Sequence, residues 1–450
     1  MKSRVFVFPS LIAIAACAAC ASSSGKGSVN PQISDDVRRQ LDALSPSELP
    51  APPADPTNAY LDDARAAVLG KQLFFDTRFS GPLLDEANNG DPGTLGLQGD
   101  TGKVGCVSCH VPSTGFSDSR STRGQISLAS GWTHRRTMSL LDVAQVQILN
   151  WDGRHDSAFS QPFTPIEDPV EFNSSRLYAA QQMARLYRTD YEAIFGSLPS
   201  LDAYPTVAPA DAGCTELPVD EVHGVCVKPG YTDPDVTRVV VNMGKAIEAY
   251  TRTLRCGPSR FDAWVAGDPL ALSADEQAGA LLFVGKAACT TCHSGPYLTD
   301  RSFHNVGLHP DFRFFVVPID DRGASAGLPA MLADPLISKG SFSDGYDGRL
   351  DQLPSDPTDM GDSFATPSLR CVGRRPSFMH TGQFRSLDDV VNFFNHGGDT
   401  SGFQGTSENY ARNLSDVESA QLVAFLKSLD GPGPDADIIA PPTLPPDPAQ

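Results

Sequence analysis

Apolar residues recur at helical spacing in several stretches of the chain, and no stretch of consequence alternates as a strand would. One stretch contains Leu61, Val68, Leu69 and Leu73 and ends at Phe74-Phe75-Asp76. A second opens with a capping box at Ser273-Ala274-Asp275-Glu276 and continues through Leu281, Leu282 and Phe283. Four further helical stretches are predicted over residues 175–196, 235–255, 386–396 and 415–429, the last opened by Ser415 and Glu418. The pattern predicts a mostly α-helical protein.

The two ends of the chain have different patterns. Lys2 and Arg4 precede an apolar run over residues 5–21, which is the arrangement of a signal peptide rather than a bilayer span. The run contains Ile14-Ala15-Ala16-Cys17, which resembles a lipoprotein cleavage box; an ordinary cleaved signal is the alternative. We therefore expect a signal peptide at 1–17, export to the periplasm and a lipid anchor at Cys17. A Ser-, Gly- and Pro-rich stretch predicts a flexible linker at 18–57, and a Pro- and Asp-rich end predicts a disordered tail at 432–450.

Composition limits the class of partner. The 450 residues, of which 40% are hydrophobic, are enough for two or three folded domains. The 39 glycines and 37 prolines predict long loops between modest elements. The net charge of −19 argues against a nucleic-acid partner, because such surfaces need basic patches.

The clearest chemical signal is a pair of C-x-x-C-H motifs, Cys106-Val107-Ser108-Cys109-His110 and Cys289-Thr290-Thr291-Cys292-His293. This spacing suits a covalently bound c-type haem, with two thiols on one turn for the vinyl groups and the adjoining His as iron ligand. Zinc and a redox dithiol are the alternatives, but no pattern in the sequence groups four zinc ligands. We expect two haem c groups, ligated by His110 and His293, in two cytochrome c-like domains at 58–265 and 266–431.

Several further segments resemble one family, the bacterial di-haem cytochrome c peroxidases, and within it the branch of the methylamine-utilisation di-haem enzyme. The resemblance covers residues from about 59 to 431. The segments that carry it are Leu73-Phe74-Phe75-Asp76, Asn150-Trp151-Asp152-Gly153-Arg154, Asp168-Pro169-Val170-Glu171, Ser302-Phe303-His304-Asn305-Val306-Gly307, Thr366-Pro367-Ser368-Leu369-Arg370 and Met379-His380-Thr381-Gly382.

The resemblance implies an enzyme that reduces hydrogen peroxide at the N-terminal haem. Peroxide cleavage needs an open iron site and an acid/base that moves a proton between the two oxygens. The family places a Gln and a Glu for this role 10 and 20 residues after an inter-haem Trp, which here gives Gln161 and Glu171 after Trp151. Trp151 resembles the family's electron relay between the haems. A small periplasmic cytochrome c or cupredoxin is the implied electron donor, and family members are often dimers.

Some positions depart from the family pattern at the haem ligands. The peroxidase branch has a resting-state His ligand where this chain has Ile126, beside Gln125; His134 is the nearest candidate. At the second haem the usual Met or Tyr ligand is replaced by Phe394, so this haem is five-coordinate or uses another side chain, with His396 the nearest.

The family's calcium ion and the remaining cysteines raise two further questions. Arg136 stands where the family has a calcium-binding Asn; this argues against calcium, although the other ligands would be backbone carbonyls and water. In an oxidising compartment the four remaining cysteines suggest disulfides, Cys214 with Cys226 and Cys256 with Cys371.

These observations leave three hypotheses. The first is a peroxidase that passes electrons through the C-terminal haem and Trp151, favoured by Gln161 and Glu171. The second is a peroxide-driven oxidase that modifies a Trp or Tyr of a partner protein, favoured by the missing distal His, whereas Phe394 counts against it. The third is a non-enzymatic di-haem electron carrier, which would need two six-coordinate haems and has no use for Glu171.

Overall fold

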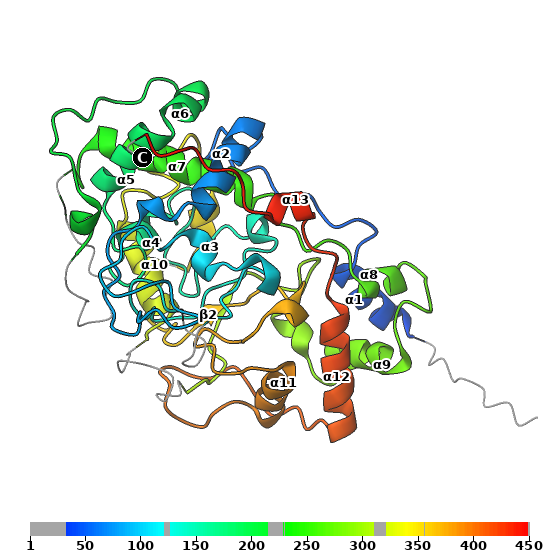
Figure 1. Ribbon diagram of the computed structural model, residues 1–450. Coiled ribbons are helices and arrows are strands. Elements are labelled where there is room, and N and C mark those ends of the chain that lie inside the picture. The colour runs from blue at the N-terminus through cyan, green and yellow to red at the C-terminus, as the bar shows by residue number, and fades with distance from the viewer. Residues whose placement is uncertain are drawn as a thin grey trace, which may run out of the picture.

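The computed structural model of the chain describes residues 33–120, 127–214, 228, 230–309, 321–354 and 356–448. Within these ranges the fold is mostly helical, and long loops join the helices (Figure 1). The helices are α1 (Asp35–Leu44), α2 (Ala64–Phe75), α3 (Cys106–Cys109), α4 (Phe163–Glu167), α5 (Arg176–Leu186), α6 (Arg188–Phe195), α7 (Pro234–Thr251), α8 (Arg260–Val265), α9 (Ala274–Val284), α10 (Ala324–Ala333), α11 (Leu387–His396), α12 (Asp416–Ser428) and α13 (Ala436–Ile439). Two short strands, β1 (Phe303–His304) and β2 (Phe364–Ala365), pair antiparallel.

The N-terminal domain is built around helices α2, α5 and α7, which confirms the helices predicted near 61–75, 175–196 and 235–255. The 175–196 stretch is divided at Tyr187 into α5 and α6. Helices α2 and α7 meet at Gly70, where a Cβ atom would lie 1.8 Å from the Ala246 carbonyl oxygen. Glycine therefore allows the close contact that fixes the segment in front of the first C-x-x-C-H motif.

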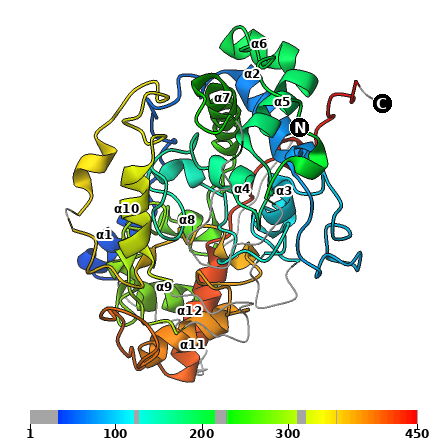
Figure 2. The same cartoon turned by 90° about the vertical axis from the view of Figure 1, so that its left-hand side faces the viewer.

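The C-terminal domain repeats this scheme with α9, α11 and α12. Ser273 with Glu276 and Ser415 with Glu418 form the predicted capping boxes of α9 and α12. A Cβ at Gly279 of α9 would lie 2.0 Å from the Gln421 carbonyl oxygen of α12, so glycine again permits a tight crossing. Figure 2 shows these three helices at one end of the molecule and α5, α6 and α7 at the other.

The predicted domain limits need two corrections. Leu41 and Leu44 of α1 are buried in the core of the C-terminal domain, so the prediction of a flexible linker is wrong for residues 35–44. Phe261 and Trp264 of α8 belong to the same core, so the C-terminal domain begins before α8 rather than after residue 265. Both short helices pack by a few apolar residues, a signal that is too weak to stand out from the Pro- and Ser-rich sequence around it.

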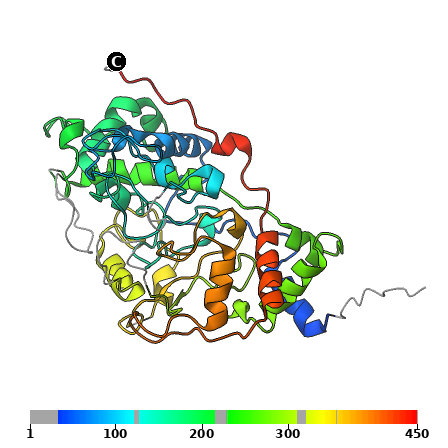
Figure 3. The ribbon, with the colours of Figure 1, turned by 60° about the horizontal axis from the view of Figure 1, so that its bottom comes forward.

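The prediction of a disordered tail is wrong for residues 432–448. This segment, which we call the strap, leaves the C-terminal domain after α12, includes α13 and crosses onto the N-terminal domain (Figure 3). Its backbone carbonyls accept hydrogen bonds from Lys71 (2.5 Å), Gln72 (3.1 Å), Arg78 (2.9 Å) and Tyr250 (3.2 Å). Arg185 pairs with Asp447 near its end. The strap is held by these polar contacts and by Ile438 and Ile439, which pack against a buried cluster that includes Phe74 and Tyr250.

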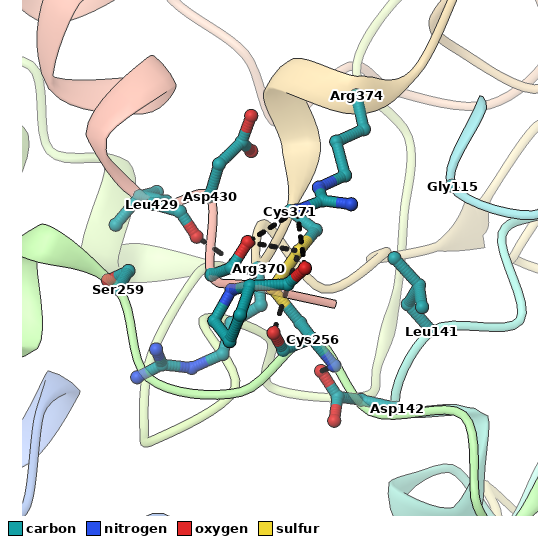
Figure 4. The surroundings of a disulfide bond; sticks show 12 residues. Gly115, Leu141, Asp142, Cys256, Ser259, Arg370, Cys371, Arg374, Leu429 and Asp430 are labelled. Carbon is teal, nitrogen blue, oxygen red and sulfur yellow. Dashed lines mark hydrogen bonds between the residues drawn. A yellow bond between two sulfur atoms is a disulfide. The ribbon is translucent and has the colours of Figure 1, made fainter. Parts of the chain in front are cut away.

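A disulfide between Cys256 and Cys371 lies where the two domains and the strap meet, and it confirms the predicted pairing (Figure 4). Both cysteines are fully buried. Gly433, at the start of the strap, donates its backbone N–H to the Cys256 carbonyl at 2.9 Å. The other predicted pair includes Cys226, which lies outside the described residues.

The predicted signal peptide at 1–17 and its Cys17 lie outside the described residues. None of the helices in the described part of the chain is long and apolar enough to cross a membrane.

Candidate active site

The two C-x-x-C-H motifs adopt single turns that place their thiols and histidines close together. Cys106 and Cys109 form the ends of α3, and the hydroxyl of Ser108 accepts a hydrogen bond from Gly105 N at 3.0 Å. Cys289 opens the 3-10 turn η5 (Cys289–Thr291), with Cys292 directly after it. The four thiols are half-buried and form no disulfide. They are therefore free for the thioether bonds of haem c.

Both motif histidines are prepared to bind a metal through Nε2. The Nδ1 atom of His110 lies 3.1 Å from the Phe116 carbonyl oxygen, and Nδ1 of His293 lies 2.9 Å from the Leu298 carbonyl oxygen. A proton on Nδ1 serves these contacts and leaves the Nε2 lone pair for iron. Burial lowers the pKa of each imidazole to about 4, so both rings are neutral at neutral pH.

A single cavity brings together the first motif and the predicted catalytic side chains. Its wall contains Cys106, Cys109 and His110 from the motif, and Trp151, Gln161 and Glu171 from the later loops. His134, the candidate distal ligand, also lies in the wall, whereas Gln125 and Ile126 are outside the described residues. Residues about 40 to 65 positions apart in sequence thus surround the space in which a haem bound by His110 would lie.

Glu171 occupies an environment that favours its protonated form. Its backbone is fixed by hydrogen bonds from Glu171 N to the Asp168 carbonyl (3.1 Å) and from Ser130 N to the Glu171 carbonyl (3.0 Å). Burial, together with the negative charge of Asp168, raises the pKa of Glu171 to about 8, and Arg154 opposes this rise. A carboxyl group with a pKa near neutrality can both accept and return a proton, which is the property a general acid/base needs.

Two arginines show that the cavity fits an anionic cofactor. Arg136, which is buried, and Arg375, which is half-buried, both lie in its wall, and within the described chain no carboxylate forms an ion pair with either. Arg136 Nη2 and Arg375 Nε have no hydrogen-bond partner there. Burial and the charge of Arg375 lower the pKa of Arg136 to about 9, and burial lowers that of Arg375 to about 10. Because buried charges need compensation, the propionates of a haem are a fitting counter-charge.

Sequence reasoning treated Arg136 only as an obstacle to calcium and overlooked Arg375. The neighbouring pairs Arg135-Arg136 and Arg374-Arg375 were the available signal, since neither pair has adjacent acidic residues in sequence. The burial of Arg136 depends on a contact with Ser377 of the C-terminal domain, which the sequence does not display.

The second motif lacks the sixth iron ligand that the family pattern predicts. Phe394, at the family's usual ligand position, is half-buried on α11 and its ring contacts Phe393. His396 is exposed, and its Nδ1 lies 2.8 Å from the Asn392 carbonyl of its own helix, which fits a helix end better than an iron ligand. Cys292, Asp300 and His304 are the one cluster of three potential metal ligands in the described ranges. Because Cys292 belongs to the haem motif, this cluster does not make a separate zinc site.

Comparison with known proteins agrees with the geometry of the site. The family model described as di-haem cytochrome c peroxidase matches residues 64–269. A cytochrome-c peroxidase, IdrP1 of Denitromonas iodatirespirans, is 30% identical over 406 residues, which cover 86% of this chain and 87% of that protein. The methylamine utilization protein MauG of Methylorubrum extorquens is 30% identical over 393 residues, covering 85% and 82%. The crystal structure of the di-haem peroxidase BthA from Burkholderia thailandensis shares the fold, with a TM-score of 0.57 and 22% identity over 88% of this chain and 94% of that one.

Proposed function

Because the chain belongs to the di-haem cytochrome c peroxidase family, we propose that this oxidoreductase reduces hydrogen peroxide at the haem site of Cys106, Cys109 and His110. Electrons come from the second haem site, at Cys289, Cys292 and His293, and pass by way of Trp151. The observation that carries the proposal is the cavity in which Gln161 and Glu171 share a wall with the first haem motif.

The proposed roles follow from the chemistry of each side chain. A bound haem would supply the iron that binds peroxide and passes electrons to it. Glu171 would take a proton from one oxygen of the peroxide and deliver it to the other, so that the O–O bond can break. Gln161 orients the peroxide by hydrogen bonding. Each peroxide consumes two electrons and two protons and gives two molecules of water.

Substitution of Glu171 by Gln tests this role. The amide has nearly the same shape but cannot accept and return a proton, so we expect peroxide consumption to slow by about 100-fold or more. The assay is stopped-flow mixing of the fully ferric protein with one equivalent of hydrogen peroxide. Glu192→Gln, at an exposed position on α6, is the matched control. An unchanged rate in Glu171→Gln protein would remove Glu171 from the mechanism.

The same experiment separates the alternatives. Reaction of the ferric protein without prior reduction would fit an open first site; reaction only after one-electron reduction would indicate an internal ligand, with His134 the first to mutate. Oxidation of Trp or Tyr in a partner protein would favour the second function, for which the similarity to MauG is the specific observation. Two purely low-spin haems that do not consume peroxide would indicate an electron carrier.

We also propose that the protein acts in the periplasm, anchored to a membrane by a lipid on Cys17. The support is the basic and apolar order of the first 21 residues, and haem c attachment itself takes place outside the cytoplasm. A small cytochrome c or cupredoxin would supply the electrons. Labelling of cells with a radioactive fatty acid should mark the wild-type chain and leave a Cys17→Ala variant unlabelled; equal labelling would disprove the anchor.

A further inference from the structure

The indole of Trp151 is held from both domains. Its Nε1 donates a hydrogen bond to the Arg136 carbonyl at 2.8 Å, and the backbone N–H of Arg136 donates to the His380 carbonyl at 2.8 Å. The Trp151 carbonyl accepts a hydrogen bond from Ala365 N, also at 2.8 Å. Arg136 belongs to the N-terminal domain, whereas Ala365 and His380 come from the second half of the chain. The backbone around Trp151 is thus fixed, and the Nε1 hydrogen bond restrains the indole along one edge of the ring.

The ring of His380 adds a direct contact to the aromatic surface of the indole. It meets the Trp151 indole edge to face, with centroids 6.4 Å apart and an angle of 63° between the planes. On its other side it stacks on Phe364, at 3.5 Å and 15°. His380 is 4% exposed, so it has little room to turn. The three rings form a continuous aromatic row between the two domains.

A pair of ionic contacts closes the far end of the row. The Arg135 guanidinium lies over the Phe364 ring, 5.6 Å from its centroid. The same guanidinium pairs with Asp152 at 2.6 Å and with Asp321 at 2.5 Å. Asp152 directly follows Trp151, and Phe364 of β2 is the residue that stacks on His380. Arg135 therefore contacts both the segment that carries the indole and the strand that supports His380.

His380 is also an uncharged neighbour for the indole. Burial lowers its pKa to about 3, with Arg135 acting in the same direction and Asp321 against it. A neutral ring adds no positive charge beside a side chain that must give up electrons. A charged one would oppose electron loss by electrostatic repulsion.

From this arrangement we propose that His380 is a positioning residue for electron transfer, which holds the Trp151 indole in a fixed orientation between the two haem sites through its stack with Phe364. The inference rests on the proposed role of Trp151 and assigns no step of peroxide chemistry to His380.

The test measures electron movement between the haems rather than turnover. The holoprotein is reduced by one electron, with peroxide absent, and the redistribution of that electron between the haems is followed by absorption. Reduction potentials of both haems are measured separately on each variant. We expect His380→Ala to slow redistribution by about tenfold or more, because misplacement of a positioned group by about 1 Å can cost about 100-fold, while the potentials stay unchanged. His380→Phe, which retains a flat ring, should remain within about twofold of wild type.

Further variants distinguish the possible failures. Trp151→Phe must slow redistribution strongly; if it does not, the proposed relay itself is wrong. If Trp151→Phe slows the transfer and His380→Ala does not, the positioning role of His380 is wrong and the relay stands. If His380→Ala does not fold, Phe364→Leu removes the stacking partner without touching His380, and a wild-type rate in that variant would also overturn the inference.

Discussion

Removal of the Cys256–Cys371 disulfide should cost the protein a large part of its stability. The bond joins residues 115 positions apart, so in the unfolded chain it closes a long loop. The chain-entropy relation for a loop of this length gives about 4.8 kcal/mol of stabilisation at 25 °C. Both cysteines are fully buried, and Cys256 Sγ lies 4.0 Å from the Leu429 carbonyl in the native state, so the folded protein has little space in which to relax. We therefore expect nearly the full effect.

The perturbation is the double variant Cys256→Ala and Cys371→Ala, which removes the cross-link without burying a new hydroxyl group. Thermal unfolding of the holoprotein, followed by circular dichroism, should shift downward by roughly 10–20 °C, taking 2–4 °C per kcal/mol for a domain of this size. Haem content is measured in parallel, because the comparison requires that the variant still carries haem at both motifs. A decrease of less than about 1 kcal/mol in the free energy of unfolding would refute the reasoning. It would mean that the unfolded chain is already constrained without the disulfide.

Three further predictions concern the strap, a buried carboxyl group and calcium. Ending the chain after Gly433 removes the strap from residue 434 onward, with hydrogen bonds that are each worth about 1 kcal/mol before ordering entropy is counted. We expect the free energy of unfolding to fall by about 2 kcal/mol and proteolysis of the N-terminal domain to become faster. Deletion of residues 449–450 alone should change neither quantity. Burial and Asp55 raise the pKa of Glu248 from 4.5 to about 8. As the pH rises, the unfolded chain therefore releases this proton before the folded chain does, so the free energy of unfolding should fall between pH 4.5 and 8. Glu248→Gln should make this fall with pH smaller. An equal fall in the variant and the wild type would contradict the prediction. Finally, EGTA should leave the haem spectrum unchanged, since Arg136 already supplies a buried positive charge; a spectral change reversed by added calcium would show that the ion binds after all.

The sequence predicted the helices that have strong local signals. Helices α9, α11 and α12 each begin one residue after the serine that caps them, Ser273, Ser386 and Ser415, because a side-chain cap acts over three or four residues. The strap lacks such a signal. Its carbonyls are satisfied by Lys71, Gln72 and Arg78, which lie more than 350 positions earlier in the chain. A Pro-rich segment without apolar periodicity thus becomes ordered by groups that only the tertiary fold brings near.

The candidate site shows the same division between local and long-range information. The spacing of Trp151, Gln161 and Glu171 was readable because they follow one another in one loop region, and all three lie in the wall of the cavity at the first haem motif. The place of Arg375 in that wall and the stack of His380 on Phe364 were not readable. Each of these features joins segments that are brought together only when the two domains pack.

The junction between the domains is held at three separate places. The disulfide fixes the connection between α7 and α8 to the loop after β2, the strap crosses from α12 to α2, and Arg135 joins Asp152 to Asp321. All three join residues of the N-terminal domain or its connection to residues of the later part of the chain. Electron transfer between two cofactors depends steeply on their separation, so a junction held in this way would keep the proposed path through Trp151 at constant length. Such a junction suits a protein whose two haem sites exchange electrons across the domain contact, and it makes that contact, rather than the cavity alone, the feature on which the proposed activity depends.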